Sequence, residues 1–165
     1  MMRKSLFGLF GWGLLCFLIL GCTRETTNLT STANAFQPAL YKKTMCFGPC
    51  PAFTFKVTAT GAATLSIDRP LKGTPLSELP LGSYRAQMTD AAAWNVLIHA
   101  AAEKVEYSSL DSLYDNSFIT DLPATITEWE GKSVTNRYNG PDLTTLYAAF
   151  DEAMAALNWR PIETK

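Results

Sequence analysis

The chain has 165 residues, of which 47% are apolar and 18% charged, and its formal net charge is −1. This length suits one folded domain of ordinary size with its own hydrophobic core. The lysines and arginines form no run or patch along the sequence, so nucleic acid and anionic lipid headgroups are poor candidates for partners. No internal repeat marks a second domain.

The N-terminal segment has the pattern of an export signal. Arg3 and Lys4 precede a mostly apolar stretch that ends at Leu20. As a helix this stretch would span roughly 22 Å, less than the ~30 Å hydrocarbon core of a bilayer. A cationic start, a short apolar stretch and a small residue at its end are typical of a secretory signal peptide. We therefore expect residues 1–21 to be a signal peptide that is removed on export.

The end of this stretch, Ile19-Leu20-Gly21-Cys22, resembles the lipobox of bacterial lipoproteins. The resemblance implies that Cys22 becomes the first residue of the mature protein and carries covalent lipid, including palmitate. With two or more acyl chains the anchor would be stable, whereas an unlipidated Cys22 would be an unpaired, exposed thiol. Thr23 stands where an aspartate is associated with retention in the inner membrane. The expected location is therefore the cell envelope, in the outer rather than the inner membrane, with the domain outside the cytoplasm.

The residues that follow Cys22 are rich in Thr, Ser and Asn and show no apolar periodicity. This composition predicts a disordered tether over residues 22–38. Without the first 21 residues, 144 remain, with 12 basic and 15 acidic side chains and a net charge of −3. We expect one domain over residues 39–160.

The first half of this domain is predicted to be mostly β-strand. Alternating apolar and polar residues predict strands at 40–45, 52–59 and 63–67, and a further strand at 83–88. Prolines and leucines between residues 69 and 81 indicate an ordered loop.

The second half is predicted to contain two helices and a hairpin. Thr89 is the expected N-cap of a helix that runs to about Val105. Strands at 124–130 and 132–138 are expected to form a hairpin. Pro141 is the expected first residue of the last helix. The apolar face of that helix would comprise Leu143, Leu146, Tyr147, Phe150, Met154 and Leu157. Together these elements predict an α+β domain, an antiparallel sheet of five to six strands with two helices packed on one face.

Cys46 and Cys50 are the two cysteines left in the mature domain, because Cys16 lies in the signal peptide and Cys22 would carry lipid. A compartment outside the cytoplasm permits a disulfide between them. In an extended chain their Cα atoms would lie about 13 Å apart, so a turn must bring them to bonding distance. We predict a structural disulfide between the first two strands, worth about 2 kcal/mol in chain entropy.

The segment KTMCFGPCPAFTFKV, together with TDLPATITEWEGKSVTNRY and the final amphipathic helix, resembles the bacterial domain-of-unknown-function family 6438. The resemblance covers roughly residues 39 to 158. Its most specific element is the Cys-Phe-Gly-x-Cys-Pro run that starts at Cys46. It implies an architecture and a frequent location in the cell envelope, and no established activity.

Two other uses of the cysteine pair remain open. Cys-x-x-x-Cys-Pro also occurs in Sco-type copper chaperones, and Met45 adds a soft ligand for Cu(I). Those proteins add a distant histidine, but the one histidine here, His99, is expected on the solvent side of its helix. Thiol exchange requires a lowered thiolate pKa, commonly from a helix N-terminus, whereas a strand is predicted after Cys50. Phe47 would favour the neutral thiol further if it shielded the site.

For hydrolytic chemistry, one loop offers Asp115, Asn116 and Asp121, which could line a ligand-facing groove. Such residues more often form turns and caps. The sequence contains no nucleophile motif, no glycine-rich phosphate loop and no histidines at metal-ligand spacing. We therefore expect no catalytic residue, no metal and no cofactor beyond the lipid. The favoured function is non-enzymatic binding of an envelope protein or a small ligand, and the alternative is a thiol redox or copper-handling protein.

Overall fold

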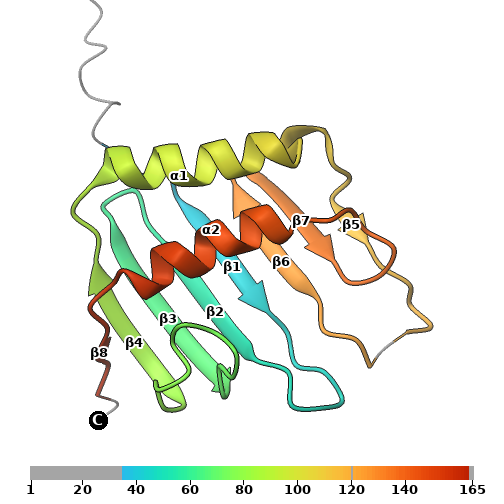
Figure 1. Cartoon of the computed structure of the whole chain (residues 1–165), viewed down its shortest axis with the longest axis horizontal. Coiled ribbons are helices and arrows are strands. Elements are labelled where there is room, and N and C mark those ends of the chain that lie inside the picture. The colour runs from blue at the N-terminus through green and yellow to red at the C-terminus, as the bar shows by residue number, and fades with distance from the viewer. Residues whose placement is uncertain (1–34, 120, 164–165) are drawn as a thin grey trace, which may run out of the picture.

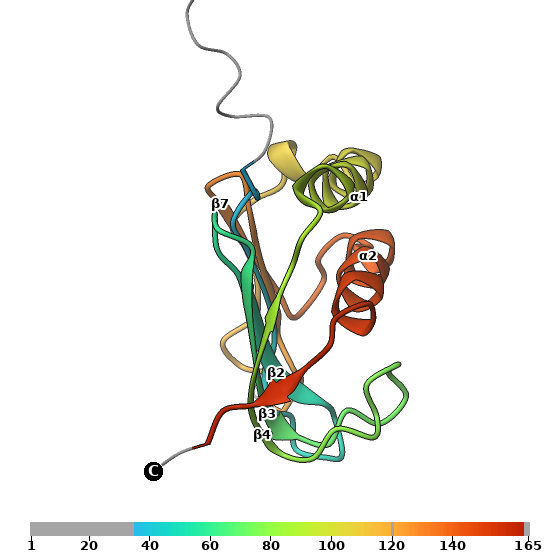
Figure 2. The same cartoon turned by 90° about the vertical axis from the view of Figure 1, so that its left-hand side faces the viewer.

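The computed structural model describes residues 35–119 and 121–163. The predicted signal peptide, Cys22 and most of the predicted tether lie outside these residues. Within them, one sheet carries two helices on the same face, and the opposite face of the sheet is covered by neither helix (Figures 1 and 2). No helix in this part of the chain is long and apolar enough to cross a bilayer.

The sheet has eight strands in the order β5-β7-β6-β1-β2-β3-β4-β8. The strands of the first half are β1 (Ala39–Lys43), β2 (Ala52–Val57), β3 (Ala62–Arg69) and β4 (Gly82–Gln87). Those of the second half are β5 (Leu113–Tyr114), β6 (Thr125–Trp129), β7 (Lys132–Asn136) and β8 (Arg160–Pro161). The helices are α1 (Ala91–Lys104), α2 (Thr144–Ala155) and a short 3-10 helix, Tyr107–Ser109.

The predicted fold class is confirmed, but the predicted number of strands is too low. The two additional strands, β5 and β8, have two residues each and form the two edges of the sheet. Strands this short carry no alternation that a sequence pattern could reveal. In addition, β5 pairs with β7 in parallel, so the sheet is mostly rather than wholly antiparallel.

Both predicted helix starts are wrong by one to three residues. Asp90, not Thr89, is the N-cap of α1, and its Oδ1 accepts a hydrogen bond from the backbone N–H of Ala93 at 2.8 Å. α2 begins at Thr144, and Pro141 lies ahead of it. Asp142 Oδ1 accepts from the hydroxyl of Thr144 at 2.5 Å and from its backbone N–H at 2.9 Å. These two hydrogen bonds lower the pKa of Asp142. Acceptor side chains just ahead of a helix satisfy its free N–H groups.

The hairpin predicted across Gly131 is confirmed. Trp129 pairs directly with Lys132, which leaves a loop of two residues. Glu130 and Gly131 have φ angles of 51° and 77°. Two successive residues in the left-handed region give a turn whose twist matches that of the flanking strands.

The core lies between the helices and the sheet and is rich in aromatic rings. Tyr41 of β1 is fully buried at its centre and stacks on Phe150 of α2, with 5.1 Å between ring centroids. Phe53 meets the Tyr41 ring edge-on at 5.2 Å. The ring of Trp94 in α1 also packs near Phe150, with 6.1 Å between the ring centroids. These contacts join both helices to the central strands.

Residues 35–38, placed in the predicted tether, contact the domain. The Phe36 side chain is only 8% exposed and lies against Gly61 in the turn between β2 and β3. The Trp94 indole Nε1–H donates to the carbonyl of Gln37 at 2.8 Å. Contact with the domain therefore begins a few residues before the expected boundary at Ala39.

The sheet has two different ends. We call the end that carries residues 44–51, 70–81 and 115–124 the loop end (Figure 1). The opposite end carries the turn between β2 and β3 and the two-residue turn between β6 and β7, and we call it the turn end. The N-terminal segment joins the domain at the turn end, because the Phe36 N–H donates to the carbonyl of Ala59 there.

Candidate functional site at the loop end

The structure contains the predicted disulfide between Cys46 and Cys50. It lies in the connection between β1 and β2, and the two Cα atoms are 5.9 Å apart. This separation is well within the range of ordinary disulfides. The bond therefore closes a small ring at the loop end, with Phe47, Gly48 and Pro49 inside it.

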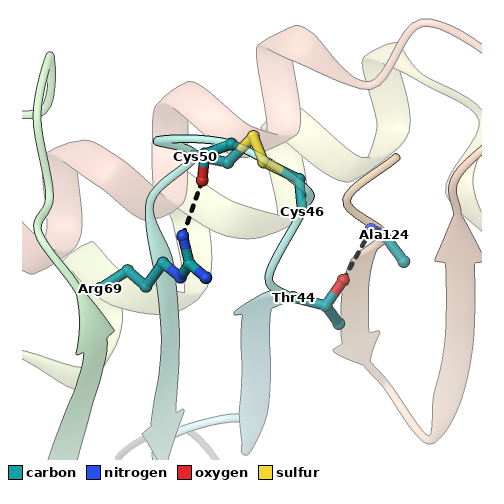
Figure 3. The surroundings of a disulfide bond; sticks show 6 residues. Thr44, Cys46, Cys50, Arg69 and Ala124 are labelled. Carbon is teal, nitrogen blue, oxygen red and sulfur yellow. Dashed lines mark hydrogen bonds between the residues drawn. A yellow bond between two sulfur atoms is a disulfide. The ribbon is translucent and has the colours of Figure 1, made fainter. Parts of the chain in front are cut away.

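Two further contacts hold the disulfide loop to the rest of the domain (Figure 3). Arg69, the last residue of β3, donates from Nη1 to the carbonyl of Gly48 at 2.7 Å. On the other side, the Thr44 N–H donates to the carbonyl of Ala124 and the Ala124 N–H donates to Thr44 Oγ1, at 2.9 and 2.8 Å. No sequence pattern indicates the contact made by Arg69, because that contact depends on the register between β2 and β3.

The loop between β5 and β6 contains the three polar residues that could have lined a ligand-facing groove, and their contacts are those of turn-forming residues, the alternative that was also expected. Asp115 forms an ion pair with Arg137, 3.5 Å from Oδ2 to Nη1, and its Oδ1 accepts from the Asn116 N–H at 2.7 Å. Asn116 Oδ1 in turn accepts from the Phe118 N–H at 3.0 Å. Asp121 contributes its backbone carbonyl, which accepts from the Phe47 N–H at 3.2 Å. These contacts order the loop and join it to the disulfide loop.

Each of the two loops presents a phenylalanine to solvent. The Phe47 side chain is 96% exposed and that of Phe118 is 93% exposed. Met45 and Leu122, in the same two loops, are 60% and 40% exposed. Phe47 does not shield the cysteines, because its side chain is almost fully exposed to solvent. Single exposed apolar residues are common, but almost complete exposure of two rings on fixed loops is not.

The surroundings of the disulfide do not match those of a reactive thiol or of a Sco-type copper site. The residues after Cys50 lead into β2 at Ala52 rather than into a helix, so Cys50 does not lie at the N-terminus of a following helix. His99 lies at the turn end, where its ring is 3.2 Å from Glu130 and 3.5 Å from Glu103. Within residues 35–119 and 121–163, no three His, Cys, Asp or Glu side chains are grouped so as to hold a metal ion.

Tyr41 of β1 and Asp151 of α2 have buried polar atoms where α2 packs on the sheet. The Tyr41 hydroxyl and Asp151 Oδ1 are inaccessible to solvent and interact with each other, although neither atom has a hydrogen bond of good geometry within the described part of the chain. Burial raises the pKa of both groups, although attraction to Lys43 opposes the shift at Asp151. Tyr107 differs, because its hydroxyl donates to the carbonyl of Thr127 at 2.8 Å, and burial raises its pKa to about 12. Burying these two polar groups without good hydrogen bonds lowers the stability of the fold.

The loop residues Asp115, Asn116 and Asp121 do not line the main groove of the surface. That groove has a volume of about 990 Å³ and lies between β4, α1 and the C-terminal end of α2. Leu97 and Leu157 form part of its apolar wall. The groove and the loop end are therefore separate features of the domain.

Comparison with known proteins gives one result. Residues 39–154 match the family described as a domain of unknown function, DUF6438. The match runs from the first residue of β1 to the last turn of α2, and so includes the disulfide loop and the core. No curated protein and no solved structure matches the chain. Since the match covers well over half of its length, the chain belongs to the DUF6438 family.

Proposed function

We propose that the protein is a lipid-anchored component of the bacterial cell envelope and that its domain is a non-enzymatic interaction module. Cys22 would hold the lipid, in the outer rather than the inner membrane, and the domain would lie outside the cytoplasm. The lipobox-like sequence before Cys22 supports the anchor. The Cys46–Cys50 disulfide supports a location outside the cytoplasm, because disulfides persist in oxidising compartments.

The observation that carries the interaction role is the exposure of Phe47 and Phe118 on two braced loops. An aromatic ring that stays in solvent does not gain the free energy that burial would contribute. Neither Phe47 nor Phe118 packs in the core. The disulfide and the hydrogen bonds described above fix the loop backbones before any partner binds. A fixed aromatic side chain loses little conformational entropy on binding, which makes it an effective anchor at a protein interface.

The surroundings of the disulfide favour a structural over a catalytic role. A low thiolate pKa usually requires a helix N-terminus or a close cation, whereas here the cysteines join two strands. The nearby cation Arg69 donates to a backbone carbonyl rather than to a sulfur atom. Within this proposal, the disulfide keeps Phe47 in its exposed position.

Metabolic labelling with a radioactive or alkyne-bearing palmitate tests the anchor. We expect label on the wild-type protein and none on Cys22→Ser, together with retention of the wild-type protein in the envelope membrane fraction. Label that persists in Cys22→Ser, or a wild-type protein without label, would show that Cys22 is not the lipidation site.

Photo-cross-linking in intact cells tests the interaction role. A benzoyl-phenylalanine at position 47 or 118 is expected to give a discrete cross-linked species. The matched control is position 96, because Val96 on α1 is also exposed, at 69%, and is also apolar. Equal cross-linking from all three positions, or none from positions 47 and 118, would contradict the assignment of the loop end as the contact surface.

A further inference from the structure

The sheet face that carries no helix brings together basic residues that lie far apart in the sequence (Figure 2). The register places Lys56 of β2 opposite Thr64 of β3, and Thr64 opposite Arg85 of β4. Arg85 is in turn opposite Arg160 of β8. Residues directly opposite one another in antiparallel strands project from the same face. We call Lys56, Arg85 and Arg160 the basic row.

The orientation of this row follows from its neighbours in the sequence. Phe55, Tyr84 and Trp159 are each adjacent to a member of the row, and all three pack on the helix-covered side. Since side chains alternate between the two faces along a strand, the row projects from the open face. Arg85 and Arg160 lie at the edge of the sheet, where they also border the groove between β4, α1 and α2. The three basic side chains are accordingly exposed.

In the part of the chain that the structure describes, no acidic side chain forms an ion pair with the basic residues of this row. Arg85 and Arg160 stand directly opposite each other, an arrangement that destabilises a strand pair because the charges repel. Among residues 35–119 and 121–163, the ion pairs with acidic side chains involve Arg137 and, when it is protonated, His99, and none involves the basic row. Two adjacent arginines without an acidic partner, on a protein with an excess of acidic residues, indicate a surface for an external anion.

A second row on the same face adds hydroxyl groups and a fourth cation. The register aligns Lys42, Thr54, Ser66 and Ser83 across β1 to β4. Hydroxyl and ammonium groups donate hydrogen bonds to phosphate oxygens. The acidic side chains on the strands of this face are Asp68 and Glu128, against four basic ones, Lys42, Lys56, Arg85 and Arg160.

The flat shape and the side chains of this surface indicate which kind of anion it would bind. With strands about 4.8 Å apart, the basic row extends over roughly 15 Å, and it is too flat to enclose a single small anion. The strands of the open face present no aromatic side chain, so bases and sugar rings would have no stacking platform. A two-dimensional array of phosphate groups fits such a flat, basic, hydroxyl-bearing face best.

We propose that the open face of the sheet lies on anionic lipid headgroups of the membrane that holds the anchor. This revises the expectation from the linear sequence that such headgroups are poor partners, because the basic residues become neighbours only through strand register. This proposal rests on the proposed function, because the lipid on Cys22 is what would keep the domain beside a bilayer. The residues between Cys22 and Ala35 could span up to about 45 Å when extended, more than the thickness of a helix layer and a sheet layer together. Docking in this way orients the domain, with both helices directed away from the bilayer.

Vesicle flotation tests the proposal without the lipid anchor. The protein is the mature chain from residue 22 with Cys22→Ser, which retains every residue that the structure describes. The probes are phosphatidylcholine vesicles with and without about one-third phosphatidylglycerol, at low salt. The test variant is Arg85→Gln/Arg160→Gln. The matched control is Lys72→Gln/Lys104→Gln, which removes the same charge from exposed positions outside the open face.

We expect binding to the anionic vesicles only, about tenfold or more weaker for the test variant and within about twofold of the parent for the control. Binding should also decline at high salt. The test variant should melt at the same temperature as the parent or slightly higher, because a repulsive pair is removed. Equal binding by the two variants, equal binding to neutral vesicles, or retention on DNA or a soluble anionic polysaccharide without vesicle binding would each overturn the proposal.

Because the tested chain carries no lipid, the result is independent of the labelling experiment on Cys22. If labelling fails and vesicle binding succeeds, the headgroup-binding face stands and the anchor does not. If labelling succeeds and vesicle binding fails, the anchor stands and the open face does not bind the membrane.

Discussion

The two faces of the sheet are built from the same strands but differ in chemistry. On the covered face, the alternate residues of β2 are Phe53, Phe55 and Val57, and all are buried against the helices. On the open face, the intervening residues are Thr54 and Lys56. The covered face therefore supplies most of the stability, whereas substitutions on the open face should change the free energy of unfolding little. A similar contrast separates the two ends of the sheet, because the loop end has a covalent constraint and the turn end is held by tight turns and noncovalent contacts.

The largest effect is expected at the covered face. Phe150→Ala removes a fully buried ring that stacks on Tyr41 and lies beside Trp94. We expect a loss of about 3–5 kcal/mol in the free energy of unfolding, measured by urea denaturation. Thr64→Ala on the open face is the control and should change this energy by less than about 0.5 kcal/mol. Similar losses for both variants would remove the distinction between the faces.

The next effect is expected at the loop end. Replacing Cys46 and Cys50 together with serine should lower the free energy of unfolding by about 2 kcal/mol, because the small ring no longer limits the unfolded chain. The wild-type protein unfolded in the presence of a reductant should match the double variant, and the reductant should have no effect on the variant. If the reductant does not change the wild-type protein, the disulfide does not contribute to stability.

A smaller effect, which depends on pH, is expected beneath α2. Burial raises the pKa of Asp151 above its ordinary value of 3.8, so the folded protein retains this proton when the unfolded chain has lost it. The stability associated with this proton is fully present below pH 3.8 and is lost as the pH rises through the folded-state pKa. Asp151→Asn should therefore be more stable than the wild-type protein at neutral pH, by less than the disulfide contributes, and equally stable in acid. Thermal melts across this pH range measure the difference, and a constant difference at all pH values would contradict it.

The smallest effect is expected at Phe47. Because its side chain is 96% exposed, Phe47→Ser should change the free energy of unfolding by less than about 0.5 kcal/mol. Thermal melting and a thiol assay under non-reducing conditions would show whether the fold and the disulfide remain intact. Loss of stability comparable with that of the double cysteine variant would mean that Phe47 is a structural residue rather than a contact residue.

The main strands and both helices could be predicted because each has a pattern that extends over several residues. Phe53, Phe55 and Val57 repeat with the period of a strand, and Leu146, Phe150 and Met154 repeat with the period of a helix. The edge strands β5 and β8 were missed because two residues cannot establish a period, and they form only where β7 and β4 offer free backbone groups. The start of α1 was misplaced by one residue because the neighbouring residues Thr89 and Asp90 are both good caps.

The candidate site was predictable only in part. The disulfide followed from the number and spacing of the cysteines. The contact of Arg69 with the disulfide loop did not, because it joins residues 21 positions apart in the sequence through the register of two strands. Asp115 and Asn116 were identified as a loop pair, but whether their side chains would face a ligand or the backbone depended on how the loop folds.

The sequence by itself determined the fold class, the elements with long periodic patterns and the pairing of Cys46 with Cys50, because these depend on local composition and spacing. Only the tertiary structure determined which distant residues become neighbours. The exposure of Phe47 and the alignment of Lys56, Arg85 and Arg160 are of this second kind. The physical reason is that strand order and register are fixed by packing of the whole core, so a surface assembled across strands has no counterpart in the linear sequence.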